Sequence, residues 1–131
     1  MIDDVYFLTV EEVVEIHADQ IARYGGDVGV RDLGLLESAV HAARNVATYG
    51  ETCDLCDMAA AYLFHIAENQ PFVDGNKRSA LASGLVFLHQ NGVAVEDPEG
   101  TLYDIMIGVA TKETAKPQVA SALRSLLAPS V

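Results

Sequence analysis

A nine-residue stretch from Gln70 to Arg78 combines residue types that bind phosphate and a divalent metal ion. It reads Gln-Pro-Phe-Val-Asp-Gly-Asn-Lys-Arg and holds the chain's only adjacent pair of basic side chains, Lys77 and Arg78. Because an Ala- and Leu-rich helical segment follows directly, backbone N–H groups at the start of that helix can point at an anion. Asp74, just before Gly75, can hold magnesium against phosphate oxygens. These residues predict a site for phosphate and a divalent metal.

The composition of the chain limits the classes of partner that it is expected to bind. The 131 residues carry 19 Asp plus Glu against 8 Lys plus Arg, a formal net charge of −11. This length is most simply one domain, residues 1–131. Direct nucleic-acid binding is not expected, because phosphate neutralisation needs many basic side chains on one face. No signal-peptide pattern and no long apolar run is present, so we expect a cytoplasmic protein without a membrane-spanning segment.

The two cysteines form a single Cys-x-x-Cys, Cys53 and Cys56. A zinc site would need two more ligands at matching spacing, and a redox pair of this kind usually lies in a βαβ unit. We therefore expect two small, largely buried thiols.

The four histidines recur every 24 residues, but their neighbours share no pattern that would indicate a repeat. We expect structural or surface roles for them, each toward the end of a helix, where the helix dipole favours a cation. They are His17, His41, His65 and His89.

Helical periodicity, interrupted by Gly and Pro, predicts six helices and no substantial sheet. A capping box at Thr9–Glu12 starts the first helix, and Pro117 suits the first turn of the last. A polar connection is expected over 44–52 and a short β-prone stretch over 93–95. The helices are expected to begin at Thr9, Asp32, Asp54 or Asp57, Asn76, Thr101 and Pro117, and to end near Gly25, Ala43, Gln70, Asn91, Ala110 and Leu127. The fold class is therefore all-α, a compact helical bundle.

The stretch Gln70–Arg78 resembles the signature of the Fic/Doc superfamily, which reads His-Pro-Phe-x-Asp-Gly-Asn-Lys-Arg in the Doc-like branch. Other segments in the same order also resemble Doc-type death-on-curing proteins, namely Ile21–Gly26, Gly29–Val40, Ala60–His65 and Leu85–Gly92. The adenylylating branch usually reads Gly-Asn-Gly-Arg, with a second arginine three positions on. Lys77 and Leu81 stand at those two positions here, and both departures favour the Doc-like branch.

The resemblance implies a toxin of a type II toxin–antitoxin system that uses ATP, or another nucleoside triphosphate, and Mg²⁺ to modify a protein hydroxyl. The Doc-like branch resembles a kinase whose target is elongation factor Tu. Neither end of the chain matches the family's inhibitory segment, so a separately encoded antitoxin is the expected partner.

The resemblance also assigns roles within the motif. Asp74 would hold Mg²⁺, Phe72 would anchor the loop in the core, and the phosphates would be bound by Gly75, Asn76, Lys77 and Arg78. The alternatives are an ordinary turn carboxylate, a simple helix cap and a solvated basic pair.

Gln70 stands where the family places a histidine as general base. A neutral amide cannot take a proton from the target hydroxyl, and general-base catalysis is worth roughly 100- to 10,000-fold. His65 is expected to point around the helix away from the loop, so it is a poor substitute. Three readings stay open for a member of this family: a weakened or inactive transferase, natural or engineered; an enzyme that uses another base; and a non-catalytic binding module that keeps nucleotide or antitoxin binding. A generic helical interaction domain is a further alternative, but it would leave the Lys77–Arg78 pair unexplained.

Overall fold

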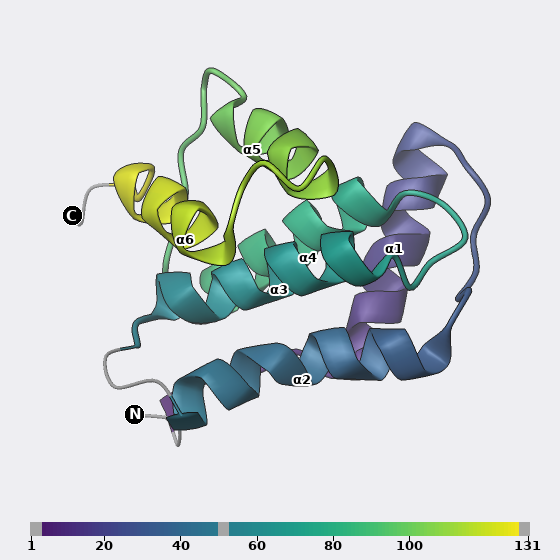
Figure 1. The fold of residues 1–131 in the computed structure, drawn as a ribbon, viewed down its shortest axis with the longest axis horizontal. Coiled ribbons are helices and arrows are strands. Elements are labelled where there is room, and N and C mark those ends of the chain that lie inside the picture. Colours follow the sequence, from purple (N-terminus) through teal and green to yellow (C-terminus); the bar gives the residue numbers. More distant parts are fainter. Residues whose placement is uncertain (1–3, 50–52, 129–131) are drawn as a thin grey trace.

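Six helices form the architecture of the described part of the chain, residues 4–49 and 53–128 of a computed structural model (Figure 1). Within these residues the β structure is limited to two isolated bridges, Val30 with Phe72 and Val95 with Leu127. The predicted all-α fold is confirmed. The helices are α1 (Val10–Tyr24), α2 (Leu33–Tyr49), α3 (Leu55–Asn69), α4 (Asn76–Gln90), α5 (Thr101–Ala110) and α6 (Lys116–Ser125).

Helix α3 is the centre of the molecule. It packs against α2 on one side, α4 on another, and α5 and α6 above, as Figure 1 shows. Most of its residues are buried, including Tyr62, Leu63 and Ile66, as expected for a helix that is apolar around most of its circumference. The Tyr62 hydroxyl accepts a hydrogen bond from the Leu8 N–H at 2.9 Å, which ties the N-terminal segment to this helix.

A close approach between α3 and α4 fixes the two helices that the Gln70–Arg78 stretch connects. A Cβ atom at Gly84 of α4 would overlap the Leu63 side chain and lie 3.3 Å from the Ala59 carbonyl oxygen. Only glycine therefore permits this spacing. The end of α3 and the start of α4 are thus held at a set separation.

Two reciprocal caps start helices as the sequence indicates. Thr9 Oγ1 accepts from the Glu12 N–H at 3.1 Å, and the Glu12 carboxylate accepts from the Thr9 N–H at 2.9 Å. At α3 the N-cap is Asp54 and not Asp57, whose carboxylate instead accepts from the Asp54 N–H at 3.0 Å. Arg124 of α6 donates to Asp54 at 2.7 Å, which fixes α6 on the start of α3.

Two predicted helix ends are wrong. Helix α2 continues to Tyr49 where a polar connection was expected after Ala43, because this last part still covers the core: Arg44 lies 4.4 Å above the Phe7 ring. Residues 50–52 of the expected connection lie outside the described residues. Helix α6 ends at Ser125, short of Leu127, because Leu127 turns to form a bridge with Val95 of the β-prone stretch.

The two cysteines are free thiols beside the start of α3. Cys56 is buried and Cys53 is half-buried. Burial raises the pKa of Cys56 to about 11, and it raises the pKa of Cys53 as well. Both thiols therefore stay protonated near neutral pH, which makes them poor nucleophiles.

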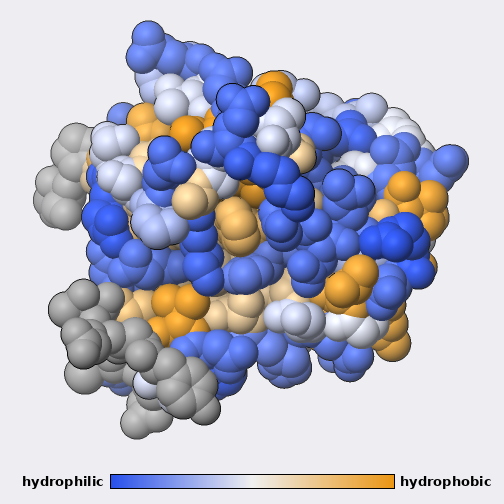
Figure 2. Space-filling model, in the orientation of Figure 1, coloured by the Kyte–Doolittle hydropathy of each residue, from blue (hydrophilic) through white to orange (hydrophobic). Residues whose placement is uncertain are grey.

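The surface facing the viewer in Figure 2 is largely hydrophilic. None of the helices in residues 4–49 and 53–128 is long and apolar enough to cross a membrane. Large apolar side chains gather instead around α3, where Phe72, Phe87 and Met106 are almost completely buried.

Candidate functional site

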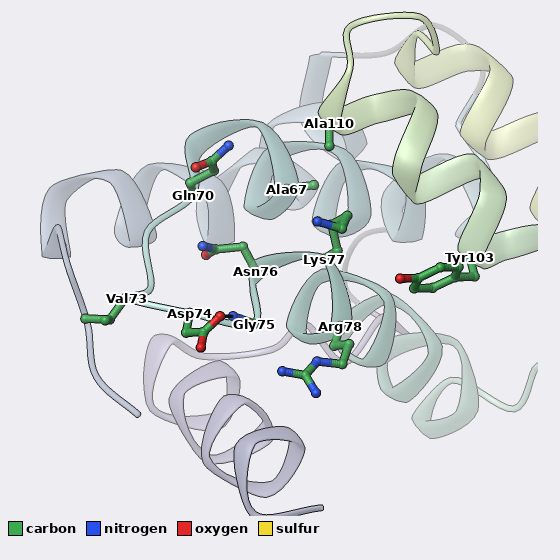
Figure 3. A pocket seen from close by; sticks show the side chains of 10 residues that line it. All are labelled: Ala67, Gln70, Val73, Asp74, Gly75, Asn76, Lys77, Arg78, Tyr103 and Ala110. Carbon is green, nitrogen blue, oxygen red and sulfur yellow. Dashed lines mark hydrogen bonds between the residues drawn. The ribbon is translucent and has the colours of Figure 1, made fainter. Parts of the chain in front are cut away.

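One pocket of about 420 Å³ brings together all six residues that the sequence predicts for the site (Figure 3). These residues are Gln70, Asp74, Gly75, Asn76, Lys77 and Arg78. Four lining residues were not predicted: Ala67 of α3, Val73 of the loop, and Tyr103 and Ala110 of α5. The pocket therefore lies where the end of α3, the start of α4 and one side of α5 meet.

The loop of residues 70–75, the motif loop, turns the chain sharply between α3 and α4. Gln70 ends α3 with left-handed backbone angles, φ 48° and ψ 57°, and Pro71 cannot continue the helix. Phe72 is 1% exposed, so its expected packing into the core is confirmed. Gly75 also has positive φ, 70°, and a Cβ there would lie 3.0 Å from the Ile21 side chain. Glycine at this position therefore serves both the turn and the close packing on α1.

The linker between α1 and α2, residues 25–32, holds the motif loop in place through hydrogen bonds. The Val73 N–H donates to the Gly29 carbonyl at 2.9 Å, and the Arg31 N–H donates to the Pro71 carbonyl at 2.7 Å. The Arg31 side chain donates to the carbonyl of Gln70 at 2.8 Å, at the end of α3 where carbonyls lack helical partners. The sequence does not predict this support, because no local pattern pairs two segments about 40 positions apart.

Asn76 locks the motif loop through its side-chain amide. Its Oδ1 accepts from the Phe72 N–H and its Nδ2 donates to the Phe72 carbonyl, both at 3.0 Å. The N-cap of α4 is Gly75, and no side chain caps this helix start. The first-turn N–H groups of α4 are therefore open to an anion, where the helix dipole also favours negative charge.

Asp74 carries a carboxylate that is held ionised. It accepts from the Asp27 N–H at 3.2 Å and from the Gly75 N–H at 2.8 Å, and these backbone hydrogen bonds lower its pKa. No group of three or more His, Cys, Asp or Glu side chains in the described residues could hold a metal ion. A magnesium ion at Asp74 would therefore take most of its ligands from phosphate oxygens and water, which is how Mg²⁺ commonly binds beside nucleotides.

The basic pair has no carboxylate partner among the described residues, whose four ion-pair contacts involve Arg23, Lys112 and Arg124. Arg78 is ordered by other contacts: its guanidinium donates to the Gly25 carbonyl at 2.9 Å and lies 5.6 Å from the centre of the Tyr24 ring. Lys77 extends into the pocket in Figure 3. Positive charge is thus concentrated at the start of α4 in a strongly acidic chain.

Gln70 presents its side chain at the edge of the pocket, exposed to solvent. His65 does not line the pocket; its Nε2 lies 3.0 Å from the Lys116 Nζ on α6, so the expectation that it points away from the loop is confirmed. No histidine is among the residues lining the pocket.

His17 lies beside this site and has a structural role, one of the two roles expected of the histidines. It is 1% exposed, and its ring stacks on Phe72 with centroids 3.9 Å apart. Its Nδ1 lies 2.9 Å from Ser79 Oγ, and its Nε2 accepts from the Gly29 N–H at 3.4 Å, which requires a neutral ring with the proton on Nδ1. One side chain therefore joins α1, the motif loop, α4 and the α1–α2 linker.

The expectation that every histidine lies near a helix end is wrong for His17, which occupies the middle of α1. His41 is also central, because α2 continues to Tyr49. The signal that could have identified His17 is its register: it lies on the buried stripe of α1 with Val13 and Ile21, four positions from each.

Burial makes His17 a source of pH-dependent stability. Desolvation has the largest effect on its pKa and lowers it from the ordinary 6.5. Asp74 partly offsets this by raising the pKa, and Arg78 lowers it further. Below about pH 6.5 the unfolded chain therefore binds a proton that the native ring resists. We expect the free energy of unfolding to fall as the pH drops from 7.5 to 5.5, by at most about 1.4 kcal/mol per pH unit for one histidine.

Urea unfolding at several pH values measures this slope. His17→Gln should reduce it, and the remaining slope should include a contribution from His65, whose pKa burial also lowers. His89→Gln, at an exposed position, is the matched control. An unchanged slope in His17→Gln would contradict the assignment.

Comparison with known proteins extends these observations. A model of the Fic/DOC family matches residues 7–88, which include α1 to α3 and the whole motif loop. The protein kinase doc of Escherichia phage P1 is 42% identical over 117 residues, 88% of this chain and 91% of that relative. The toxin Doc of Mycolicibacterium smegmatis is 43% identical over 110 residues, 80% of this chain and 83% of that relative. The resemblance seen in the motif thus extends over most of the sequence, and the chain belongs to the Fic/DOC family.

Proposed function

We propose that this chain is a Doc-like toxin that transfers a phosphoryl group from ATP to a hydroxyl group of elongation factor Tu, at a rate limited by Gln70. The observation that carries the proposal is the pocket itself. In it, a helix start without a side-chain cap and the basic residues Lys77 and Arg78, which have no carboxylate partner within residues 4–49 and 53–128, lie beside the ionised Asp74. The relative named protein kinase doc supports nucleotide use and the kinase class.

The phosphates would lie at the start of α4. Backbone N–H groups there, with Lys77 and Arg78, supply charge-assisted hydrogen bonds to phosphate oxygens. Lys77 adds bulk and charge in the place of the adenylylating branch's second glycine, and Leu81 replaces that branch's second arginine. Both differences favour a pose in which the terminal phosphate faces the acceptor. Asp74 would hold Mg²⁺, which neutralises charge on the phosphate oxygens.

In the proposed reaction the acceptor oxygen forms a bond to the γ-phosphorus, the bond to the β–γ bridging oxygen breaks, and ADP leaves. The hydroxyl proton must go to a base, and Gln70 stands where the family has histidine. An amide can orient the hydroxyl by hydrogen bonding but cannot take its proton at neutral pH. The proton is therefore released to water, and transfer is slow.

A second function is favoured by the same glutamine. A non-catalytic module would keep the fold and the phosphate site but use them only to bind a nucleotide or an antitoxin. Such a protein would bind ATP with no transfer to elongation factor Tu, even after a base is restored at position 70.

Radiolabelled ATP separates these functions. Elongation factor Tu is incubated with the full chain and either γ-labelled or α-labelled ATP, in parallel with the Gln70→His form. The proposal expects label from the γ position only, slowly with the native chain and rapidly with the variant. Label from the α position would identify nucleotidyl transfer instead, and ATP binding without label from either would support the binding module.

We also propose that a small, separately encoded antitoxin binds over the motif loop. The relative named toxin Doc supports a partner of this kind. A disordered segment that folds on this surface would cover the pocket. Co-expression with the neighbouring gene tests this: we expect both chains to purify together and ATP binding to fall in the complex. Purification of this chain alone would count against the proposal.

A further inference from the structure

We propose that Tyr103 of α5 forms the surface on which the nucleotide's base stacks, so that the base lies at the end of the pocket opposite Gln70. This inference rests on the proposed function, because it assigns the base end of the ligand whose phosphates occupy the start of α4. Helix α5 lies beyond residues 7–88, the span that the family model matches.

The position of Tyr103 on α5 is not explained by packing. The side of α5 that faces the core consists of Leu102, Met106 and Val109, which are each at most 1% exposed. Tyr103 lies outside that side and is 51% exposed, yet it lines the pocket. An aromatic ring that is half open to solvent and lines the same pocket as Lys77 and Arg78 is placed to contact a ligand.

Figure 3 gives the order of side chains across the pocket. Gln70 lies at one end, Lys77 in the middle, and the Tyr103 ring at the other end with its hydroxyl pointing inward. The acceptor hydroxyl must reach Gln70 if that position serves the chemistry. The terminal phosphate then lies near Gln70, the phosphate chain crosses Lys77, and the base reaches Tyr103.

The chemistry of the Tyr103 ring supports a nucleobase at this end of the pocket. The pocket wall formed by α3 and α5 contributes Ala67 and Ala110, small side chains that lie near Lys77 in Figure 3 and leave the middle of the pocket open for the phosphate chain. Phosphate oxygens gain little from an aromatic face, whereas every nucleobase has a π-face that stacks on tyrosine. Because such stacking tolerates any base, we expect the chain to bind ATP and GTP with similar affinities.

The test compares a nucleotide with its phosphate chain alone. Calorimetry measures the binding of ATP and of inorganic tripolyphosphate, both with Mg²⁺, to the full chain and its variants. Tyr103→Leu should weaken ATP binding by about 5- to 100-fold and leave tripolyphosphate binding unchanged. Tyr103→Phe, which keeps the ring, should bind ATP like the native chain. Ile107→Ala, one turn along α5 and exposed but outside the pocket, is the matched control.

The outcomes separate this inference from the proposed function. Unchanged ATP affinity in Tyr103→Leu, or equal losses for ATP and tripolyphosphate, would overturn the base assignment while leaving the phosphate site standing. The base assignment would also be overturned if the native chain bound ATP no more tightly than tripolyphosphate. Native chain that binds neither ligand would refute the proposed function, and the base assignment with it.

Discussion

Gln70→His is expected to raise phosphoryl transfer to elongation factor Tu by about 100- to 10,000-fold, roughly 3–5 kcal/mol in the activation barrier. The reason is that an imidazole near neutral pH can accept the hydroxyl proton that an amide cannot. The remaining parts of the site are already in place in the native chain: the open start of α4, the basic pair and ionised Asp74. Initial rates with γ-labelled ATP and growth after induced expression measure the gain.

The structure makes this substitution a clean test of the chemistry. The side chain at position 70 is exposed, so no core packing is disturbed. Its backbone is left-handed at φ 48°, a conformation in which histidine is among the enriched residue types. Gln70→Asn is the matched control, because asparagine also accepts this backbone but brings no base. Equal rates for the native chain and Gln70→His would show that the glutamine is not the defect or that the protein uses another base.

Local sequence rules predict the helices well, and they fail where tertiary packing decides. The caps at Thr9 and Asp54 accept hydrogen bonds from backbone N–H groups three residues away. Gly25 and Pro71 end helices through their own backbone properties. The local pattern alone therefore locates these helix ends. The end of α2 is different. The residues after Ala43 have the composition of a polar connection. However, Arg44 packs over Phe7, which belongs to the distant N-terminal segment, and this contact favours continuation of the helix.

The candidate site also has one part that the sequence predicts and another that only tertiary packing determines. Residues 70–78 are contiguous, and a short loop between packed helices must bring them together, so the sequence predicts that side of the pocket. The supports of the loop come from elsewhere in the chain. Asp27 and Gly29 bond to it through backbone atoms, which carry no residue-type signal. Tyr103 is adjacent to the pocket only because α5 packs on α3 and α4.

The phosphate site is expected to depend strongly on Arg78. Arg78→Ala should weaken ATP binding by about 1.5–3 kcal/mol, roughly 10- to 150-fold, the usual worth of a hydrogen bond to a charged group. The guanidinium is ordered before any ligand binds, because one of its nitrogens donates to the Gly25 carbonyl at 2.9 Å. Little side-chain entropy is then lost when its other N–H groups meet phosphate. Calorimetry with ATP and Mg²⁺ measures the loss.

Three controls separate a phosphate contact from general charge and from folding. Arg23→Ala removes one positive charge from an exposed ion pair with Asp19, outside the pocket, and should change ATP affinity little. Arg78→Lys keeps the charge but loses the planar fork, so its affinity should fall between those of the native chain and Arg78→Ala. Urea unfolding of Arg78→Ala checks that losing the bond to Gly25 has not unfolded the protein. If this folded variant binds ATP as tightly as the native chain, the Arg78 guanidinium does not contact the phosphates, and the proposed position of the triphosphate is contradicted.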